Sequence, residues 1–282
     1  MPASSFEFLS QFHGGCLGGR LQGELASGRW TSLDAAVAYV KLSGVRQIGH
    51  HLHAFAADNP VRMTVGIDQG GSSLEGVQTL WLVLGSSRSA LKVLHNPGGN
   101  PSPTFHPKLW LFQNATEALL VCGSGNLTGG GLYSNYEAAV LITAPIADPA
   151  ISAARTALHN WADITRPEIR AVDGPVLQLL HASGELPSEA ASHAADAVAR
   201  RARAFLSGLA TGARATSGLF RPAAVPPPPP AVPLRHFRRH LSPPGRSHGL
   251  SPGRVRLVRG QPLRPRWHRS TTACSSRSTR EG

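Results

Sequence analysis

Three short apolar runs lie close together in the middle of the chain, at 105–112, 118–124 and 136–143. Each is seven or eight residues long, which is short for a helix but typical of a buried strand. Only the polar turn QNATE separates the first two runs, and a glycine-rich connection separates the last two. We therefore expect three closely spaced strands that belong to one mixed sheet.

The residues before this cluster alternate between helical and extended patterns. From a possible helix start at Thr31, apolar residues recur at roughly helical spacing as far as Pro60, and VRMTVGID at 61–68 indicates a strand. A further helix is expected over GSSLEGVQTLWLVL and a further strand at 90–97. This order predicts an α/β fold, a sandwich in which helices flank a mixed, mostly apolar β-sheet.

The basic charge of the chain is confined to its last part. The formal net charge is +12, yet residues 1–205 hold 14 Lys and Arg against 15 Asp and Glu, whereas 206–282 hold 14 against 1. Attraction to nucleic acid through excess positive charge is therefore indicated for the tail and not for the body.

Beyond residue 211 the sequence contains 12 of the 23 prolines and the run PPPPP at 226–230. Such a segment buries too little apolar surface to offset its chain entropy, so we expect it to be disordered. Two origins stay open: a frameshift in GC-rich DNA that replaced the natural C-terminus, or a basic tail that binds nucleic acid or anionic surfaces.

The three isolated cysteines, Cys16, Cys122 and Cys274, indicate neither a disulfide framework nor a zinc site. The N-terminus lacks a basic region followed by an apolar run, and no stretch of about 18 apolar residues occurs. We expect a cytoplasmic protein without integral membrane association.

Two polar groups open the first apolar run. His106 and Lys108 are two residues apart, so on a strand they point to the same face. An ammonium beside an imidazole disfavours the protonated ring and leaves it free to act as a nucleophile or base. Lys108 can also hold an anionic oxygen, so the pair indicates chemistry on an anionic group.

Polar groups also close the second run and open the third. Ser124 and Asn126 lie where the second strand turns into a segment whose glycines let backbone N–H groups approach a ligand. Glu137 would be costly to bury unpaired, and a carboxylate that accepts an imidazole N–H would fix the tautomer of His106. A nucleophile, an orienting carboxylate and three donors suit phosphoryl transfer, for which neither a metal nor a cofactor is expected.

HPK, then GSGNLT, then NYE resembles the phospholipase D superfamily, whose signature is HxK, a following GSxN and a later Glu or Asp. The close resemblance covers about 33 residues. It implies that His106 attacks phosphorus to form a phosphohistidine, and that Lys108 and Asn126 bind the phosphate. It further implies that Ser124 is a supporting donor and that Glu137 is the orienting carboxylate.

Two features depart from the pattern of that family. Gln113 stands where the HxKxxxxD form has Asp, as in nuclease-like branches, which makes lipid specificity less expected. Only one HxK is present, although two copies normally build one site. Either two chains pair as a homodimer that supplies both histidines, which we favour, or the second copy was lost with the C-terminus.

The sequence thus favours a metal-independent phosphodiesterase, in particular an endonuclease that hydrolyses DNA. Two alternatives stay open: a phospholipase D that hydrolyses or transfers phosphatidyl groups, and an inactive module that binds nucleic-acid phosphates. The expected domains are a phospholipase D-like catalytic domain at 1–165, a helical extension at 166–210 with one amphipathic helix, and the tail at 211–282.

Other residues have plainer structural explanations. Asp68 ends an expected strand, where a carboxylate is more often a helix or turn cap than a ligand. Histidines without a third ligand make a weak metal site, and this applies to His50, His51 and His53. The aromatic residues that we expect in the core are Trp81, Trp110 and Tyr136.

Overall fold

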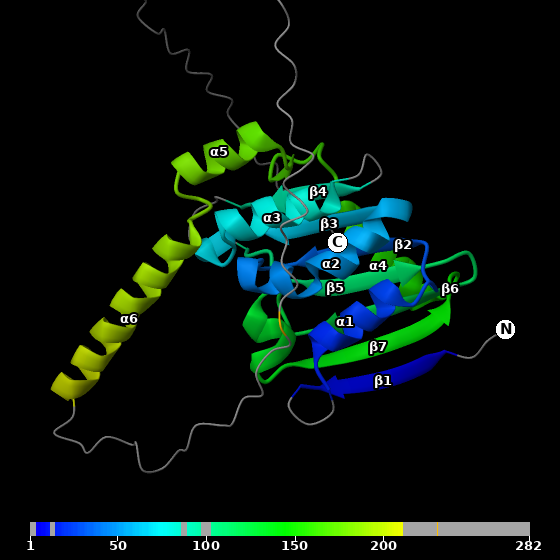
Figure 1. Ribbon diagram of the computed structural model, residues 1–282, viewed down its shortest axis with the longest axis horizontal. Helices are drawn as coiled ribbons and strands as arrows, with labels where there is room; N and C mark the ends of the chain where they lie inside the picture. Colours follow the sequence, from blue (N-terminus) through cyan, green and yellow to red (C-terminus); the bar gives the residue numbers. More distant parts are fainter. Residues whose placement is uncertain (1–3, 12–14, 86–88, 97–102, 211–229, 231–282) are drawn as a thin grey trace, which may run out of the picture. The chain divides into compact units, whose positions relative to one another are not determined.

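A computed structural model shows an α/β sandwich built on one eight-stranded mixed sheet (Figure 1). The structure describes residues 4–11, 15–85, 89–96, 103–210 and 230. The expected α/β class, with helices flanking a mixed sheet, is confirmed. The expected disorder beyond residue 211 lies outside the described residues, apart from residue 230.

The strands are β1 Ser5–Ser10, β2 Ser32–Val37, β3 Val61–Gly66, β4 Ala90–Leu94, β5 Lys108–Gln113, β6 Glu117–Gly123, β7 Ala138–Pro145 and β8 Ile169–Ala171. The helices are α1 Leu17–Ala26, α2 Leu42–Asp58, α3 Leu74–Leu84, α4 Pro149–Asn160, α5 Gly174–Ala182 and α6 Glu189–Ala210. Two short helical turns are η1 Asp68–Gly70 and η2 Gly130–Ser134.

The order of strands in the sheet is β1-β7-β6-β5-β2-β3-β4-β8. β2, β3 and β4 run parallel because α2 and α3 return the chain to the same end between them, and all other neighbours are antiparallel. The parallel strands β2, β3 and β4 are therefore flanked by antiparallel pairs on both sides, β5 beside β2 and β8 beside β4.

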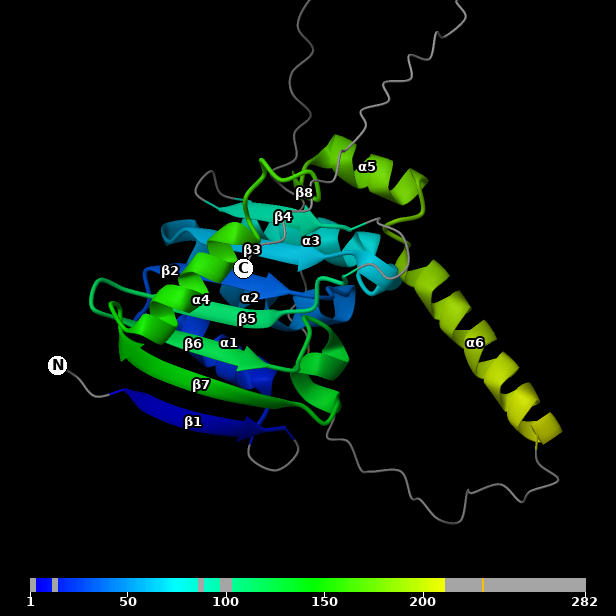
Figure 2. The ribbon, with the colours of Figure 1, turned by 180° about the vertical axis from the view of Figure 1, so that it is seen from behind.

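Helices cover both faces of the sheet. α1, α2 and α3 lie on the face seen in Figure 1, and α4 lies on the face seen in Figure 2. A large buried cluster under the first three helices includes Trp30, Trp110 and Phe112, and a smaller one under α4 includes Leu111 and Ile151. Since a fully buried side chain of this size contributes about 1.5–3 kcal/mol, the two layers hold the sheet as a rigid support.

The helix expected from Thr31 to Pro60 is wrong in its first part. Ser32–Val37 is the central strand β2, and the helix starts only at Leu42. β2 is buried on both faces and pairs with β3 on one side and β5 on the other. Its alanines favour a helix locally, but the backbone bonds and burial of a central strand outweigh that preference.

The other elements expected between 61 and 143 are confirmed. β3, α3 and β4 fall within their expected segments, and β5, β6 and β7 are the three closely spaced strands expected in one sheet. β5 starts at Lys108, three residues later than the apolar run, so His106 precedes the strand instead of lying on it.

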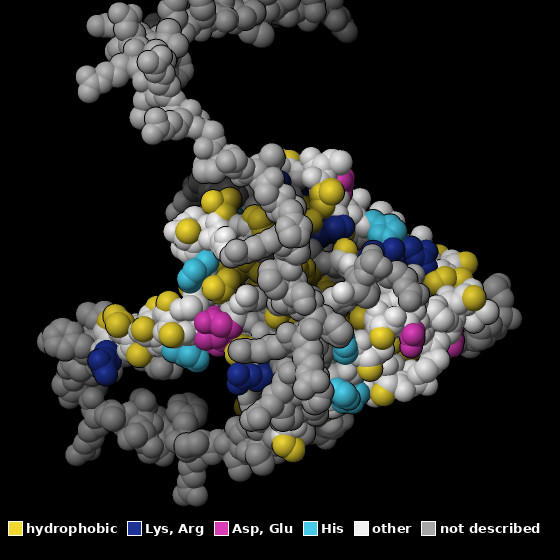
Figure 3. Space-filling view, turned by 45° about the horizontal axis from the view of Figure 1, so that its top comes forward, with side chains coloured by type: hydrophobic (Ala, Val, Ile, Leu, Met, Phe, Trp, Pro, Cys, Tyr) yellow, Lys and Arg dark blue, Asp and Glu magenta, His cyan; other side chains and the backbone are white. Residues whose placement is uncertain are grey.

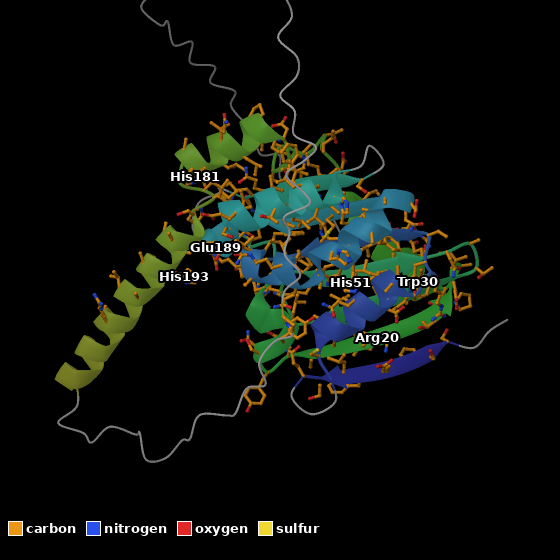
Figure 4. The ribbon with its side chains drawn as sticks, viewed as in Figure 1. Arg20, Trp30, His51, His181, Glu189 and His193 are labelled. Atoms are coloured by element: carbon orange, nitrogen blue, oxygen red, sulfur yellow. The ribbon has the colours of Figure 1, made fainter. Side chains whose placement is uncertain are left out.

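The residues after 165 add to the same sheet and core. β8 pairs with β4, and Leu177 of α5 belongs to the large buried cluster. The expected amphipathic helix is confirmed as α6, and Figure 4 shows Glu189 at its start with His193 further along. The domain boundary at 165 stays a prediction.

The described surface is mixed in character. In Figure 3, basic, acidic and histidine side chains form separate small groups over the visible face, in keeping with the near balance of charge in residues 1–205. Among the helices that the structure describes, none combines the length and the apolar character that a membrane span requires.

Candidate active site

One edge of the sheet collects all five residues singled out from the sequence. β2, β3 and β4 end at this edge, and since β5 is antiparallel to β2, it begins there. β6 ends at the same edge because Cys122 pairs with Leu109, and β7 begins there. Strand direction alone therefore brings together segments that are up to about 30 residues apart. We call this edge the site edge.

His106 and Lys108 lie side by side at the start of β5. Lys108 is 8% exposed and pairs with Val37 of β2, while the His106 side chain is exposed. The Lys108 Nζ atom lies 2.8 Å from Nδ1 and 2.8 Å from Nε2 of His106, and 3.1 Å from its carbonyl oxygen. The sequence thus predicted the juxtaposition correctly, although only Lys108 is on the strand.

The electrostatics of this pair disfavour a second positive charge. Partial burial and then the Lys108 ammonium lower the pKa of His106 from its ordinary value of 6.5. Burial also lowers the pKa of Lys108, an effect that the negative charge of Glu137 opposes. These effects therefore favour the neutral imidazole, which has one ring nitrogen free of a proton.

Tyr39 is a neighbour of His106 that sequence reasoning missed. Its ring meets the imidazole edge to face, with ring centroids 5.6 Å apart and an interplanar angle of 71°. Burial, and then the negative charge of Asp68, raise the pKa of Tyr39. No sequence signal pointed to it, since the segment around Tyr39 was assigned to a helix.

Asn126 is fixed against the end of β2. Its Oδ1 atom accepts the backbone N–H of Tyr39 at 3.2 Å, and the next residue, Leu127, donates its N–H to the Tyr39 carbonyl at 3.1 Å. Because Oδ1 is used as an acceptor, the amide group of Asn126 offers its two N–H bonds as donors.

Ser124 and Glu137 form a second fixed pair. The Ser124 hydroxyl donates to Glu137 Oε2, and it accepts the backbone N–H of Ala138 at 3.1 Å. The other carboxylate oxygen accepts from Asn135 Nδ2 at 3.3 Å. Within the described residues, the bonds of the Glu137 carboxylate thus go to Ser124 and Asn135, and the expected bond from His106 is not among them.

Gln11 supports the segment that carries Glu137. This buried residue donates its backbone N–H to the Glu137 carbonyl at 2.9 Å. Its side-chain Nε2 also donates to the Asn135 carbonyl at 2.8 Å. β1, which the sequence analysis did not identify, therefore helps to place the start of β7.

Gln113, which replaces the Asp of the HxKxxxxD pattern, lies at the opposite edge, where β5 ends. It donates to Asp34 Oδ2 at 3.1 Å and accepts from Arg155 Nε at 2.9 Å. The residue at this position therefore belongs to a polar network remote from His106.

Several plainer expectations can be compared with the structure. Trp110 is buried in the core and Trp81 packs against the core, as expected. Tyr136 is 68% exposed, so its assignment to the core is wrong.

The three neighbouring histidines, His50, His51 and His53, lie on α2, and His53 Nδ1 lies 2.9 Å from the Val83 carbonyl oxygen. Within the described ranges, no group of three potential metal ligands occurs.

No protein-family model matches the chain, and no curated protein matches its sequence. Several solved structures are similar to it, among them these three. Nuc from Salmonella typhimurium, a phospholipase D family member, is 20% identical with a TM-score of 0.45, and the match covers 61% of this chain and 100% of Nuc. NucT from Helicobacter pylori is 14% identical, with a TM-score of 0.41 and coverage of 56% and 96%. Yeast tyrosyl-DNA phosphodiesterase is 14% identical, with a TM-score of 0.33 and coverage of 51% and 32%.

Proposed function

We propose that the chain is a metal-independent phosphodiesterase of the phospholipase D superfamily, an endonuclease that hydrolyses DNA through a phosphohistidine at His106. The observation that carries this proposal is the position of the Lys108 ammonium, 2.8 Å from both ring nitrogens of His106. Such a contact keeps the imidazole neutral and places a cation where an anionic oxygen has to be bound.

The reaction has two steps. In the first, a ring nitrogen of His106 attacks phosphorus, a P–N bond forms and the P–O bond to one ester oxygen breaks. That oxygen takes a proton from the second histidine, His106 of the partner subunit, which enters this step as the imidazolium because the negative charge of the bound phosphate favours its protonated form. Water then attacks the phosphorus of the phosphohistidine and gives a proton back to the partner subunit's His106. The P–N bond breaks, and a phosphate monoester leaves. One water is consumed in each cycle.

The remaining residues stabilise charge on the phosphate. Lys108 and the amide donors of Asn126 bind its non-bridging oxygens. Ser124 has a single O–H, which donates to Glu137 in the structure, so it has to turn this hydrogen toward the phosphate to act as a supporting donor. Glu137 orients this set, because its carboxylate holds the Ser124 hydroxyl and its charge favours the protonated form of Lys108. These donors and the ammonium supply the charge neutralisation that the transition state requires.

The homodimer and the preference for DNA follow from the sequence pattern. With one HxK in the chain, a second copy is needed to provide both the nucleophile and the acid. Gln113 in place of Asp matches nuclease-like branches of the superfamily. The exposed ring of Tyr136, next to Glu137, offers a surface on which a base could stack.

The test is cleavage of supercoiled plasmid DNA in EDTA by the dimeric fraction of the full chain. Wild type should cut, His106→Ala should be inactive, and His159→Ala should match wild type because His159 is an exposed residue at the end of α4. Acid-labile phosphate on the wild-type protein after quenching would identify the phosphohistidine. Failure of wild type to cut any nucleic acid would refute the nuclease assignment.

A second candidate, a lipid phosphodiesterase, is favoured by one observation. Phe6 and Phe8 on β1 are 73% and 69% exposed, although the sequence indicated no apolar segment suited to lipid contact. If the natural substrate is a phospholipid, phosphatidylcholine vesicles should be hydrolysed by wild type and less well by the Phe6→Ser/Phe8→Ser double variant. Activity on DNA without activity on vesicles rejects this candidate.

A further inference from the structure

Asp68 is a buried carboxylate that binds N–H groups from two distant parts of the chain. It is 7% exposed and begins η1, directly after β3 and Ile67. Its Oδ1 atom accepts from His95 Nδ1 at 2.9 Å and from the backbone N–H of Asn96 at 3.1 Å. Its Oδ2 atom accepts the backbone N–H of Phe105 at 3.0 Å. The side chain thus links β3 to both described ends of the connection between β4 and β5.

A simple cap does not account for these contacts. A capping carboxylate binds N–H groups of its own helix or turn, whereas Asn96 and Phe105 are 28 and 37 residues away in sequence. The negative charge also contributes to the raised pKa of Tyr39, the ring that contacts His106. A charged group is expensive to bury, and charge-assisted bonds of this kind hold a backbone more firmly than neutral ones.

Phe105 is the residue immediately before His106. Its ring packs edge to face on Trp161, with centroids 5.7 Å apart, and the carbonyl of Pro107 accepts the N–H of Ala38 at 2.8 Å. The His106 backbone is therefore held on one side by Asp68 through Phe105, and on the other side by β2. This explains how a residue outside any strand can have a defined position.

We infer that Asp68 is a positioning residue that holds the His106 segment in the geometry needed for attack on phosphorus, acting through the Phe105 N–H. The inference rests on the proposed phosphodiesterase function. Because Asp68 is buried and its oxygens bind N–H groups of the chain itself, its loss should reduce turnover and leave phosphate binding by Lys108 and Asn126 nearly unchanged. A displacement of about 1 Å at a reacting group can lower the rate about a hundredfold.

The test compares Asp68→Ala with Asp34→Ala in the full chain. Asp34 is a matched control, since it is also a buried carboxylate, 3% exposed, but lies on β2 with Arg62 and Gln113 as its partners. For Asp68→Ala we expect kcat to fall about a hundredfold with KM within about threefold of wild type. For Asp34→Ala we expect lower thermal stability and nearly normal kcat. The conservative variant Asp68→Asn should restore part of the lost turnover, because its Oδ1 can still accept a bond.

A second measurement does not depend on activity. Hydrogen exchange of the Phe105 amide should be slow in wild type and in Asp34→Ala, and at least about tenfold faster in Asp68→Ala. Unchanged Phe105 exchange, or an equal loss of kcat in both alanine variants, would overturn the inference. If wild type proves inactive on every phosphodiester, the proposed function fails, whereas the exchange result still decides whether Asp68 anchors the segment. Should Asp68→Ala not fold, Asp68→Asn takes its place in both measurements.

Discussion

The two edges of the sheet both carry charged and polar side chains, but they use them differently. At the edge opposite the site edge, the Arg62 guanidinium binds both oxygens of Asp34, at 2.5 and 2.7 Å, and Arg29 binds both oxygens of Glu117, at 2.7 and 2.6 Å. At the site edge, the Lys108 ammonium meets an imidazole instead of a carboxylate. In Figure 4, Trp30, the neighbour of Arg29, and Glu189 lie at opposite ends of the strands.

This difference separates structural charges from functional ones. A carboxylate and a guanidinium that bind each other offset their mutual cost of burial, so removing one partner mainly destabilises the fold. A buried ammonium beside an imidazole gains little electrostatic stabilisation from its neighbour. The lowered pKa of Lys108 reflects the free-energy cost of burying its charge. In this sheet, the buried charge that indicates a site is therefore the one that binds no carboxylate directly, Lys108.

The largest expected effect on activity comes from replacing one basic residue at each edge by methionine. Lys108→Met should lower kcat/KM by about 10²–10³-fold, the cost of losing one group that stabilises the transition state, without loss of folding stability. Arg62→Met should leave turnover nearly unchanged but lower the free energy of unfolding by about 2 kcal/mol, because Asp34 stays buried. The value is below that of a fully buried pair since the Arg62 side chain is 46% exposed. Plasmid cleavage and urea unfolding measure the two quantities.

Equal activity losses in the two variants would remove the distinction between the edges. So would a large loss of stability in Lys108→Met, because that result would make Lys108 a structural cation like Arg62. Both variants replace a long basic side chain by methionine, so the change in apolar volume is similar.

The sequence predicted the site edge well because its residues lie near strand ends. Lys108 begins β5, and Ser124 and Asn126 follow β6. Because these two strands are antiparallel, the start of one lies beside the end of the other. Three closely spaced strands leave few alternatives for their pairing, so the residue spacing was enough.

What the sequence did not predict depends on long-range contacts. The burial that makes Ser32–Val37 a strand comes from β3 and β5, and no local pattern records it. The partners of Asp68 are 27 to 37 residues away in sequence, so no local pattern indicates them. From the sequence alone, an Asp at the end of an expected strand is therefore interpreted as a cap. Tyr39 meets His106 only because β2 ends beside the start of β5.

The next prediction concerns the titration of His106. Because burial and Lys108 lower its pKa, the acid limb of kcat/KM should lie below pH 6.5, and NMR of the imidazole should give a midpoint below that value. Lys108→Met should move the NMR midpoint upward. Folding stability should increase with pH between the native pKa and 6.5, since the unfolded chain binds the proton more tightly there. A midpoint that stays unchanged in Lys108→Met would mean that the ammonium does not control the ring.

Glu189 provides a carboxylate at the site edge that does have partners. Its Oε1 atom accepts from the Leu42 N–H at 2.8 Å and from the Ser73 hydroxyl at 2.5 Å, so α6 caps the starts of α2 and α3. Burial opposes the charged form, but these two bonds and the Lys41 charge lower the pKa of Glu189 overall. Glu189→Gln should therefore lower stability by about 1 kcal/mol and leave kcat unchanged.

The pH dependence gives this prediction its control. Since the native pKa of Glu189 is below its ordinary value of 4.5, the stabilisation is complete above that pH and is lost as the pH falls through the native pKa. The difference in unfolding free energy between wild type and Glu189→Gln should thus be constant near pH 7 and shrink in acid. A difference that does not change with pH would mean that the glutamate acts by shape and not by charge.

The smallest effect on stability is expected from the more exposed ion pair at the edge opposite the site edge. Arg29 and Glu117 form a bidentate ion pair, but their side chains are 41% and 26% exposed, so water and salt screen the charges. The side-chain bond from Arg29 is the main cause of the lowered pKa of Glu117. Glu117→Gln should cost no more than about 0.5 kcal/mol, and the cost should disappear in 1 M NaCl. Plasmid cleavage should stay at the wild-type rate, because Glu117 begins β6 at the end remote from Ser124. A clear loss of cleavage would show that the two edges are coupled through β6, and the division between structural and functional charges would then have to be abandoned.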